Sequence, residues 1–308
     1  PEYIHRIELD YDSNYLSITP SLITDSGTTT GLIESVEKAI TITCTREFST
    51  PLQIRVWAYA LPITSRENAE LAGIIIVNKN DIKSRIESKI MLVKVQTNVT
   101  AAVPPSLEQG FLGVDEVSHL LKSLYQNLVI PIITEIPQYY LPLENNQDFQ
   151  AGGKYIEGAI PTYYIKPSSS SGLHAFLKSY FENQNPNYVG YFTIFAFGLS
   201  TKPDINDLIV AGNVQDIGVH NANLYLGRGY ITLCHEALHG YGLYHTHKEK
   251  YTNGNFVPIT EPEKKYTYPN ANDLSGIDKA KATDNYLSYN GNNRKTLWHW
   301  QGKVILNN

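Results

Sequence analysis

Long apolar runs, cysteines and methionines are scarce in this sequence. No apolar run reaches the roughly 18 residues that a membrane-spanning helix needs, and the N-terminal segment lacks the basic and then apolar pattern of a secretory signal. The two cysteines, Cys44 and Cys234, lie far apart in the chain, so a disulfide framework is not expected. The sequence therefore predicts a protein with neither a membrane span nor a disulfide scaffold.

Clusters of basic residues are missing as well. The net charge is −5 and the lysines and arginines are scattered, which leaves no basic stripe for nucleic acid and no cationic amphipathic helix for a membrane surface. The hydrophobic content of 42% suits packed globular cores, and 308 residues are enough for two domains of ordinary size. The composition predicts a globular protein whose partner is neither nucleic acid nor a membrane.

The first part of the chain alternates apolar and polar residues. This period of two predicts half-buried strands, and turn-rich pieces such as TDSGTTTG separate them. The alternating sets are Ile7, Leu9, Tyr11; Ile40, Ile42, Cys44; Leu52, Ile54, Val56; and Met91, Val93, Val95. We therefore predict an all-β antiparallel sandwich over residues 1–100.

The pattern changes after the segment TNVTAAVPPSLEQG, residues 97–110, which we take as the domain boundary. A short buried strand is predicted within residues 191–199. Helical spacing marks three segments: 114–128, Leu173–Phe181, and a C-terminal stretch that contains Leu297, Trp300 and Val304. Residues 110–308 are therefore predicted to form a second, α+β domain.

The segment HEALHGYGLYH carries the candidate chemistry. His235 and His239 stand four residues apart, so they share one face of a helix. Gly242 can take a positive φ, end the helix and turn the chain back, so that His245 supplies a third nitrogen. Three neutral imidazoles with an open fourth position are typical of a catalytic zinc, and Glu236 is placed to take a proton from a water that the metal activates.

Other residues compete for the role of third ligand. His247 lies two residues beyond His245, and Glu261 or Glu263 offers the acidic ligand of another large HExxH group. Only His245 has the required glycine spacing, and the segment EPEKK lacks an obvious helix to present a carboxylate. Cys234 points away from His235 around the helix and is expected to be a small core residue.

A simpler alternative is a buried helix that carries histidines by chance. An apolar stripe on another face, formed by Ile231, Cys234, Leu238 and Tyr241, fits a helix packed in a core. An unpaired carboxylate such as that of Glu236 is costly inside such a helix unless it has a purpose. This cost favours the zinc site over the simpler alternative.

Residues 235–245 match, position for position, the HExxHxxGxxH signature of the metzincin metallopeptidases. The resemblance implies one catalytic Zn²⁺ bound by His235, His239 and His245, with Glu236 as general base. It also implies a twisted sheet, an active-site helix and a smaller lower subdomain within residues 110–308. In this family an antiparallel edge strand pairs with extended substrate, and residues 216–227 are the candidate for it. His220, within that segment, is expected to be an ordinary strand residue.

One feature of the family is absent from its usual place. Metzincins carry a methionine in a tight turn beneath the metal, whereas the only methionine here is Met91, in the predicted sandwich. The segment DNYLSYNG resembles that turn, with Leu287 in the methionine's place, and leucine and methionine have similar volumes. Tyr289 stands where two metzincin subfamilies place a tyrosine near zinc. We expect it to bind zinc loosely or to steady the oxyanion, and the alternative is that it only packs.

The sequence thus predicts a zinc-dependent endopeptidase that acts on protein or peptide substrates. One alternative is a zinc amidase for a non-protein amide such as a cell-wall peptide crosslink, and another is a binding module with a vestigial metal site. The N-terminal sandwich is expected to position the enzyme on a target, or to be a rigid spacer. Residues 284–305 resemble metallopeptidase domains of bacterial secreted effectors, so a secreted or delivered protein is expected.

Overall fold

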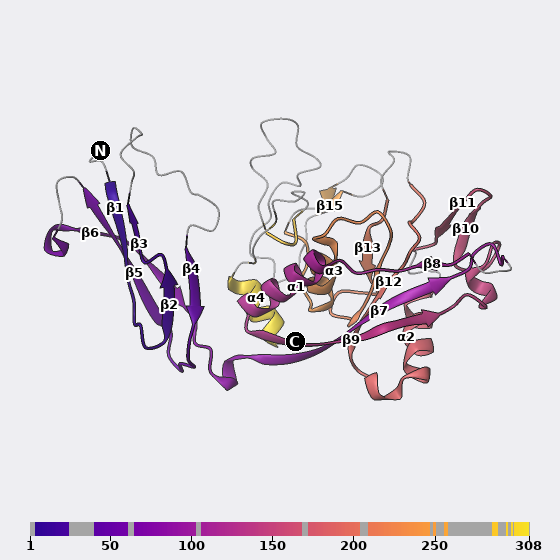
Figure 1. The fold of residues 1–308 in the computed structure, drawn as a ribbon, viewed down its shortest axis with the longest axis horizontal. Helices are drawn as coiled ribbons and strands as arrows, with labels where there is room; N and C mark the ends of the chain where they lie inside the picture. Colours follow the sequence, from indigo (N-terminus) through magenta and orange to yellow (C-terminus); the bar gives the residue numbers. More distant parts are fainter. Residues whose placement is uncertain are drawn as a thin grey trace. The chain divides into compact units, whose positions relative to one another are not determined.

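The structure is a computed structural model, and it combines strands and helices in a mixed α and β architecture (Figure 1). The chain divides into two compact units, Pro1–Arg85 and Ile86–Asn308. The residues that the structure describes are 4–24, 40–60, 65–102, 106–167, 172–203, 209–246, 249–250, 256–257, 285–288, 294, 297 and 299–307.

The first unit consists of antiparallel strands. They are β1 (Ile4–Asp10), β2 (Leu16–Thr19), β3 (Leu22–Thr24), β4 (Thr41–Cys44), β5 (Leu52–Ala60) and β6 (Glu70–Val77). One sheet has the order β3-β1-β5-β6, and β2 pairs with β4 in a second sheet. Buried residues from both sheets, among them Leu9, Ile18 and Ile54, share one core. The strands predicted up to residue 60 are confirmed as strands. The alternating residues of β5, Leu52, Ile54 and Val56, face the core, whereas Ile42 and Cys44 of β4 are exposed.

The second unit is built around a six-stranded mixed sheet. Its order is β13-β14-β12-β7-β8, and β9 also pairs with β7. The strands of the unit are β7 (Ile86–Thr97), β8 (Glu108–Gln109), β9 (Val129–Pro142), β10 (Ile156–Ala159), β11 (Thr162–Ile165), β12 (Phe192–Ala196), β13 (Gly212–Val214), β14 (Asn221–Leu224), β15 (Glu249–Lys250) and β16 (Phe256–Val257). The helices are α1 (Val114–Gln126), α2 (Leu173–Gln184), α3 (Thr232–Gly240) and α4 (His299–Asn307).

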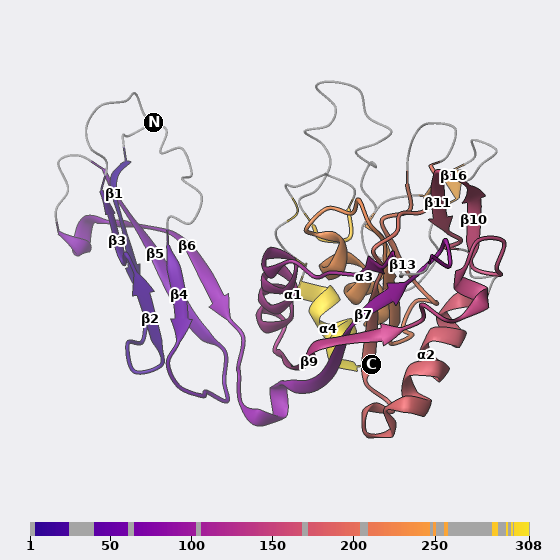
Figure 2. The same cartoon turned by 45° about the vertical axis from the view of Figure 1, so that its right-hand side comes forward.

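Helices cover both faces of this sheet (Figure 2). Ile90 and Leu92 of β7 point into a core that includes residues of α1, α3 and α4, whereas Met91 and Val93 point into a second core with α2. Successive residues of a strand face opposite sides, so one strand supplies both cores. Among the described residues, no helix combines the length and the apolar character that crossing a membrane requires.

The strand at Ile86–Thr97 does not belong to the N-terminal unit, as the alternation of Met91, Val93 and Val95 had suggested. β7 runs parallel to β12 on one side and parallel to β9 on the other. The compact units therefore divide between Arg85 and Ile86, not within residues 97–110. A central strand of a mixed sheet is buried on both faces, and its sequence does not reveal which sheet it joins.

The edge strand of this sheet also differs from the expectation. Within residues 216–227, β14 is an interior strand that runs parallel to β12. The antiparallel edge strand is the preceding one, β13 (Gly212–Val214), which pairs with β14. His220 lies just before β14, and its ring stacks on Phe192 with centroids 5.1 Å apart. The antiparallel edge position that the sequence assigned to residues 216–227 is therefore occupied by β13.

The predicted helices are confirmed at α1, α2 and α4. Helix α1 begins with the Gly113 backbone N–H donating to the carboxylate of Glu116 at 2.6 Å. Gly302 lies within α4, where a Cβ atom would come within 2.5 Å of the Asn127 amide oxygen. Glycine at this position lets α4 approach the end of α1 closely.

Candidate metal centre

Helix α3 holds two of the predicted ligands and is buried along its whole length. Its four-residue spacing places the rings of His235 and His239 next to each other, with centroids 4.6 Å apart. The helix ends in a Schellman motif: the Gly242 N–H donates to the His239 carbonyl and the Leu243 N–H to the Leu238 carbonyl. Gly242 has φ +92° in this motif, as the sequence predicted.

The reversal of the chain at Gly242 brings His245 back to the helix. The Nε2 atoms of His235, His239 and His245 then form a nearly equilateral triangle with separations of 3.0–3.2 Å. Three nitrogens bound to one zinc at 2.0–2.1 Å in tetrahedral geometry would lie about 3.3–3.4 Å apart. The triangle is thus within a few tenths of an ångström of that geometry, and these three residues can hold a metal ion.

The opposite ring nitrogens fix the orientation of two imidazoles. His235 Nδ1 lies 2.8 Å from the Tyr286 carbonyl oxygen, and His239 Nδ1 lies 2.6 Å from the Leu243 carbonyl oxygen. A carbonyl oxygen only accepts, so both Nδ1 atoms carry the proton and both Nε2 lone pairs face the centre of the triangle. Facing lone pairs repel one another unless a cation lies between them, so the donor set fits a metal.

Burial also keeps the His235 imidazole neutral. It lowers the pKa of His235 well below its ordinary value, and the neighbouring His239 and His245, followed by Arg294, lower this pKa further. A metal ligand must be the neutral imidazole, so the low pKa favours coordination at neutral pH.

A tight turn at Asn285–Ser288 lies against the histidines. The Asn285 side chain accepts a hydrogen bond from the Leu287 N–H, and the Leu287 carbonyl accepts one from the Thr246 N–H. Leu287 is fully buried in the same core as α3. The turn therefore contacts the cluster on two sides, at His235 through the Tyr286 carbonyl and at the chain just after His245.

Glu236 lies beside the triangle and is 8% exposed. Burial raises the pKa of its carboxyl group to about 8, although the nearby Arg294 charge lowers it. Gly212 of the edge strand packs directly on this side chain, because a Cβ atom at residue 212 would lie 2.8 Å from Glu236 Cγ. The carboxyl group is thus held between α3 and β13.

A cavity of about 380 Å³ opens next to His235 and Glu236. Its other lining residues are Ile209, Val210, Ala211, Gly212, Thr232 and Arg294. Arg294 was not predicted from the sequence, since a single arginine after a turn carries no motif. Its Nη1 atom lies 3.1 Å from His235 Nδ1, but that nitrogen carries a proton, so we assign its hydrogen bond to the Ser288 carbonyl oxygen, 3.2 Å away.

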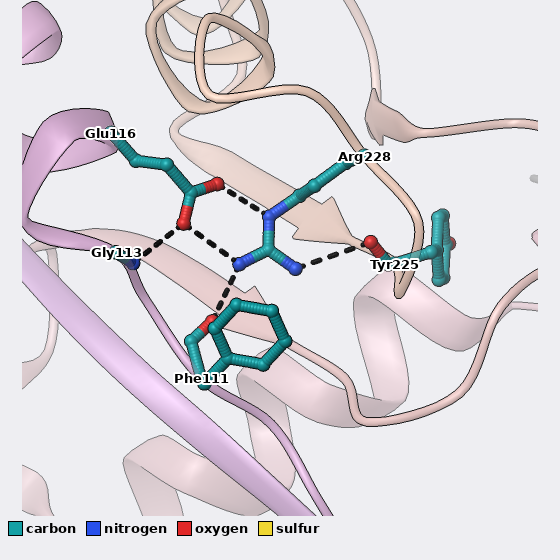
Figure 3. A network of polar contacts seen from close by, with 5 residues as sticks. All are labelled: Phe111, Gly113, Glu116, Tyr225 and Arg228. Atoms are coloured by element: carbon teal, nitrogen blue, oxygen red, sulfur yellow. Dashed lines mark hydrogen bonds and ion pairs between the residues drawn. The ribbon is translucent and has the colours of Figure 1, made fainter.

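A buried ion pair anchors the loop that leads into α3 (Figure 3). Arg228, between β14 and α3, binds Glu116 of α1 through two hydrogen bonds of 2.6 and 3.0 Å. The same guanidinium donates to the Tyr225 and Phe111 carbonyl oxygens, at 3.1 and 2.5 Å. The side chains of Arg228 and Glu116 are only 2% and 6% exposed. The start of α3 is thereby tied to the start of α1.

The remaining predicted residues lie away from the triangle or outside the described residues. His220 stacks on Phe192, and Cys234 is buried in the core of α3, where burial raises the pKa of its thiol to about 12. Tyr289, His247, Glu261 and Glu263 fall outside the described residues, so their predicted roles stay predictions.

Comparisons of the chain with family models, with curated proteins and with solved structures found no match.

Proposed function

We propose that the protein is a zinc-dependent endopeptidase, with a metzincin-like catalytic domain in Ile86–Asn308. The observation that carries this proposal is the convergence of three Nε2 atoms within 3.0–3.2 Å beside a buried glutamate that opens on a cavity. A structural zinc site has all four positions filled by protein ligands, whereas the three histidines that converge among the described residues leave one position open. The open position next to Glu236 favours a catalytic role.

His235, His239 and His245 would hold the zinc ion. When bound, zinc supplies a Lewis acid that polarises a carbonyl and makes a water molecule more acidic. Leucine at position 287 would support the ligands by shape, and Tyr289 keeps the proposed role of a loose ligand or an oxyanion donor.

Glu236 would act as the general base and then as the general acid. Burial raises the pKa of its carboxyl group, and a dication bound nearby would favour the charged form that can accept a proton. It would take a proton from water during attack and return that proton to the leaving amine.

Edge strand β13 would bind the substrate in an extended conformation. Within the part of the chain that the structure describes, it has only β14 as a sheet neighbour, and Gly212 at its start packs on Glu236. A second cavity of about 460 Å³ includes Asn213 and Val214 of this strand and shares Val210 with the cavity at Glu236. An extended peptide paired to β13 would run past the metal, which is strand addition at a sheet edge.

Two alternatives use the same site. A zinc amidase would apply this chemistry to a non-protein amide such as a cell-wall peptide crosslink. A binding module with a vestigial metal site would have no use for Glu236. Burying a carboxyl group costs free energy, so its presence favours a catalytic site. The Pro1–Arg85 unit would bind a target or act as a spacer, and a secreted or delivered protein remains our proposal for its location.

The test combines metal content with cleavage. Protein purified without added metal should contain about one zinc per chain by elemental analysis, and it should cleave a denatured protein in a chelator-sensitive way. Glu236→Gln should retain zinc and the melting temperature but lose activity by at least about 10²-fold, whereas the exposed control Glu70→Gln should keep full activity. Cleavage of peptidoglycan alone would favour the amidase. A metal-free active protein would overturn the proposal.

A further inference from the structure

We propose that Gln301 of helix α4 and Asn285 are positioning residues for the ligand His235, and that zinc binding and the packing of α4 therefore strengthen each other. This inference rests on the metal centre of the proposed function and adds its regulation by α4. Neither residue is a proposed ligand, because both act through the turn Asn285–Ser288.

Helix α4 reaches this turn through a buried hydrogen bond. Asn285 Nδ2 donates to Gln301 Oε1 at 2.6 Å, and both residues are 0% exposed. Asn285 Oδ1 accepts a hydrogen bond from the Leu287 N–H at 2.9 Å. A backbone N–H can only donate, so this contact determines which end of the Asn285 amide faces the turn and which end faces Gln301. The Asn285 side chain therefore joins α4 to the backbone of the turn.

The peptide group between Tyr286 and Leu287 carries this connection to the metal site. Its N–H, from Leu287, donates to Asn285, and its carbonyl, from Tyr286, accepts from His235 Nδ1 at 2.8 Å. A trans peptide group is planar, so its N–H and C=O point in opposite directions and can only rotate together. Holding the N–H thus fixes the direction of the carbonyl that orients the His235 imidazole.

Three hydrogen bonds in series therefore connect α4 to a proposed ligand. They measure 2.6, 2.9 and 2.8 Å. Hydrogen bonds in a buried series polarise one another, so a bound N–H makes the carbonyl of the same peptide group a better acceptor. Removing the Gln301 oxygen takes away the partner that holds the Asn285 amide in this orientation, and the effect passes to His235.

Helix α4 is itself held by the core of the second unit. Gly302 lies so close to α1 that a Cβ atom would come within 2.5 Å of the Asn127 amide oxygen, and Ile305 is buried in the core that contains α3. Gln301 therefore meets Asn285 only when α4 is packed in place. If packed α4 improves zinc binding, bound zinc must favour the packing of α4 by the same factor.

The first experiment measures zinc affinity by competition with a chelator. Gln301→Met keeps the length of the side chain without the accepting oxygen, and it should weaken zinc binding by at least about tenfold. Gln301→Glu keeps an accepting oxygen and should stay within about threefold of the parent protein. Equal zinc affinity of the parent protein and Gln301→Met would overturn the inference.

Ile305→Ala is the matched control on the same helix. It loosens the packing of α4 without touching the Asn285–Gln301 hydrogen bond, so it should lower the melting temperature but leave zinc affinity within about threefold. The visible absorption of bound cobalt(II) reports ligand geometry and should change in Gln301→Met but not in Ile305→Ala. If Gln301 only stabilised the fold, both variants would lower the melting temperature and neither would change the cobalt spectrum.

Hydrogen exchange on the parent protein tests the coupling without any variant. Zinc should slow exchange of the α4 amides by at least about tenfold more than exchange in α2, which packs on the other face of the sheet. An equal effect on the two helices would overturn the coupling, even if Gln301→Met does not fold. A parent protein that binds no zinc would instead overturn the proposed function together with this inference. Tight zinc binding that is insensitive to Gln301 would overturn the inference alone.

Discussion

The Nδ1 atom of His235 lies 2.8 Å from the carbonyl oxygen of Tyr286, a residue 51 positions further along the chain. This hydrogen bond joins α3 to the turn Asn285–Ser288 and fixes which ring nitrogen of His235 faces the cluster. Partners of this kind orient metal-bound histidines, and losing them commonly weakens metal binding by about 10–100-fold. The shape of the turn is therefore part of the site.

Truncation of Leu287 should disturb both the fold and the metal site. Its side chain is fully buried in the core shared with α3, so Leu287→Ala should cost about 2–5 kcal/mol of unfolding free energy through the cavity it leaves. The loosened turn should also weaken zinc binding. Urea unfolding and a zinc titration with a competing chelator measure the two effects.

Leu287→Met is the matched control for this turn. Methionine has nearly the same volume, so this change should alter stability by less than about 1.5 kcal/mol and leave zinc affinity within a few-fold. If Leu287→Ala left the melting temperature and zinc retention unchanged, the turn would not support the site.

Glu116 and Arg228 should stabilise the second unit only when both side chains are present. Both side chains are almost fully buried, so removing one partner leaves a buried, uncompensated charge. Glu116→Gln or Arg228→Met alone should cost about 3–5 kcal/mol. The double variant should cost less than the sum of the two, and urea unfolding of all four proteins gives the coupling energy.

An exposed ion pair in the other unit is the control for this cycle. The Arg66 and Asp10 side chains are 42% and 38% exposed, so removing either should change the unfolding free energy by no more than about 1 kcal/mol. Strict additivity at Glu116 and Arg228 would contradict the structural role that we assign to the pair.

The boundary between the units predicts which fragment folds. Residues 86–308 contain β7, which has a parallel partner on each side, and should fold alone and retain zinc. Residues 110–308 lack β7 and should not form the sheet, because β9 and β12 lose their shared neighbour. Circular dichroism, cooperative thermal unfolding and zinc content of the two fragments test this. A folded, zinc-binding 110–308 fragment would restore the boundary expected from the sequence.

His174 should make the second unit sensitive to acid. It is 2% exposed, and burial lowers its pKa to about 4, although the side chains of Asn221 and Asn213 raise it slightly. Because the folded pKa is below the unfolded one, the unfolded chain binds the proton more readily. The stabilisation is therefore complete above about pH 6.5 and is lost as the pH falls toward 4. The loss should reach about 3 kcal/mol.

The measurement for His174 is urea unfolding between pH 4 and 7.5 for the parent protein and for His174→Leu. The difference between the two curves isolates this residue from other groups that titrate in the same range. The variant should show a flatter pH dependence by about 3 kcal/mol across the window. Parallel curves would mean that His174 is not a buried neutral imidazole.

The triangle of histidines could be predicted because it is a local feature. The separation of His235 and His239 depends only on the helix repeat, and the return of His245 depends on the positive φ that Gly242 tolerates. Helices α1, α2 and α4 were predictable for the same reason, since a period near 3.6 residues reports burial of one face. Each of these features needs only residues that are close in the chain.

The placement of β7, the identity of the edge strand and the position of Arg294 were decided by the tertiary structure. A strand's pattern states which faces are buried but not which strands lie beside it, so Ile86–Thr97 could be assigned to either unit. The Tyr286 carbonyl and the Arg294 guanidinium reach His235 only after the intervening chain has folded around α3. Sequence spacing thus determined the three candidate ligands, which lie on one helix and the turn that ends it. Long-range packing determined the groups that orient those ligands and line the cavity beside them.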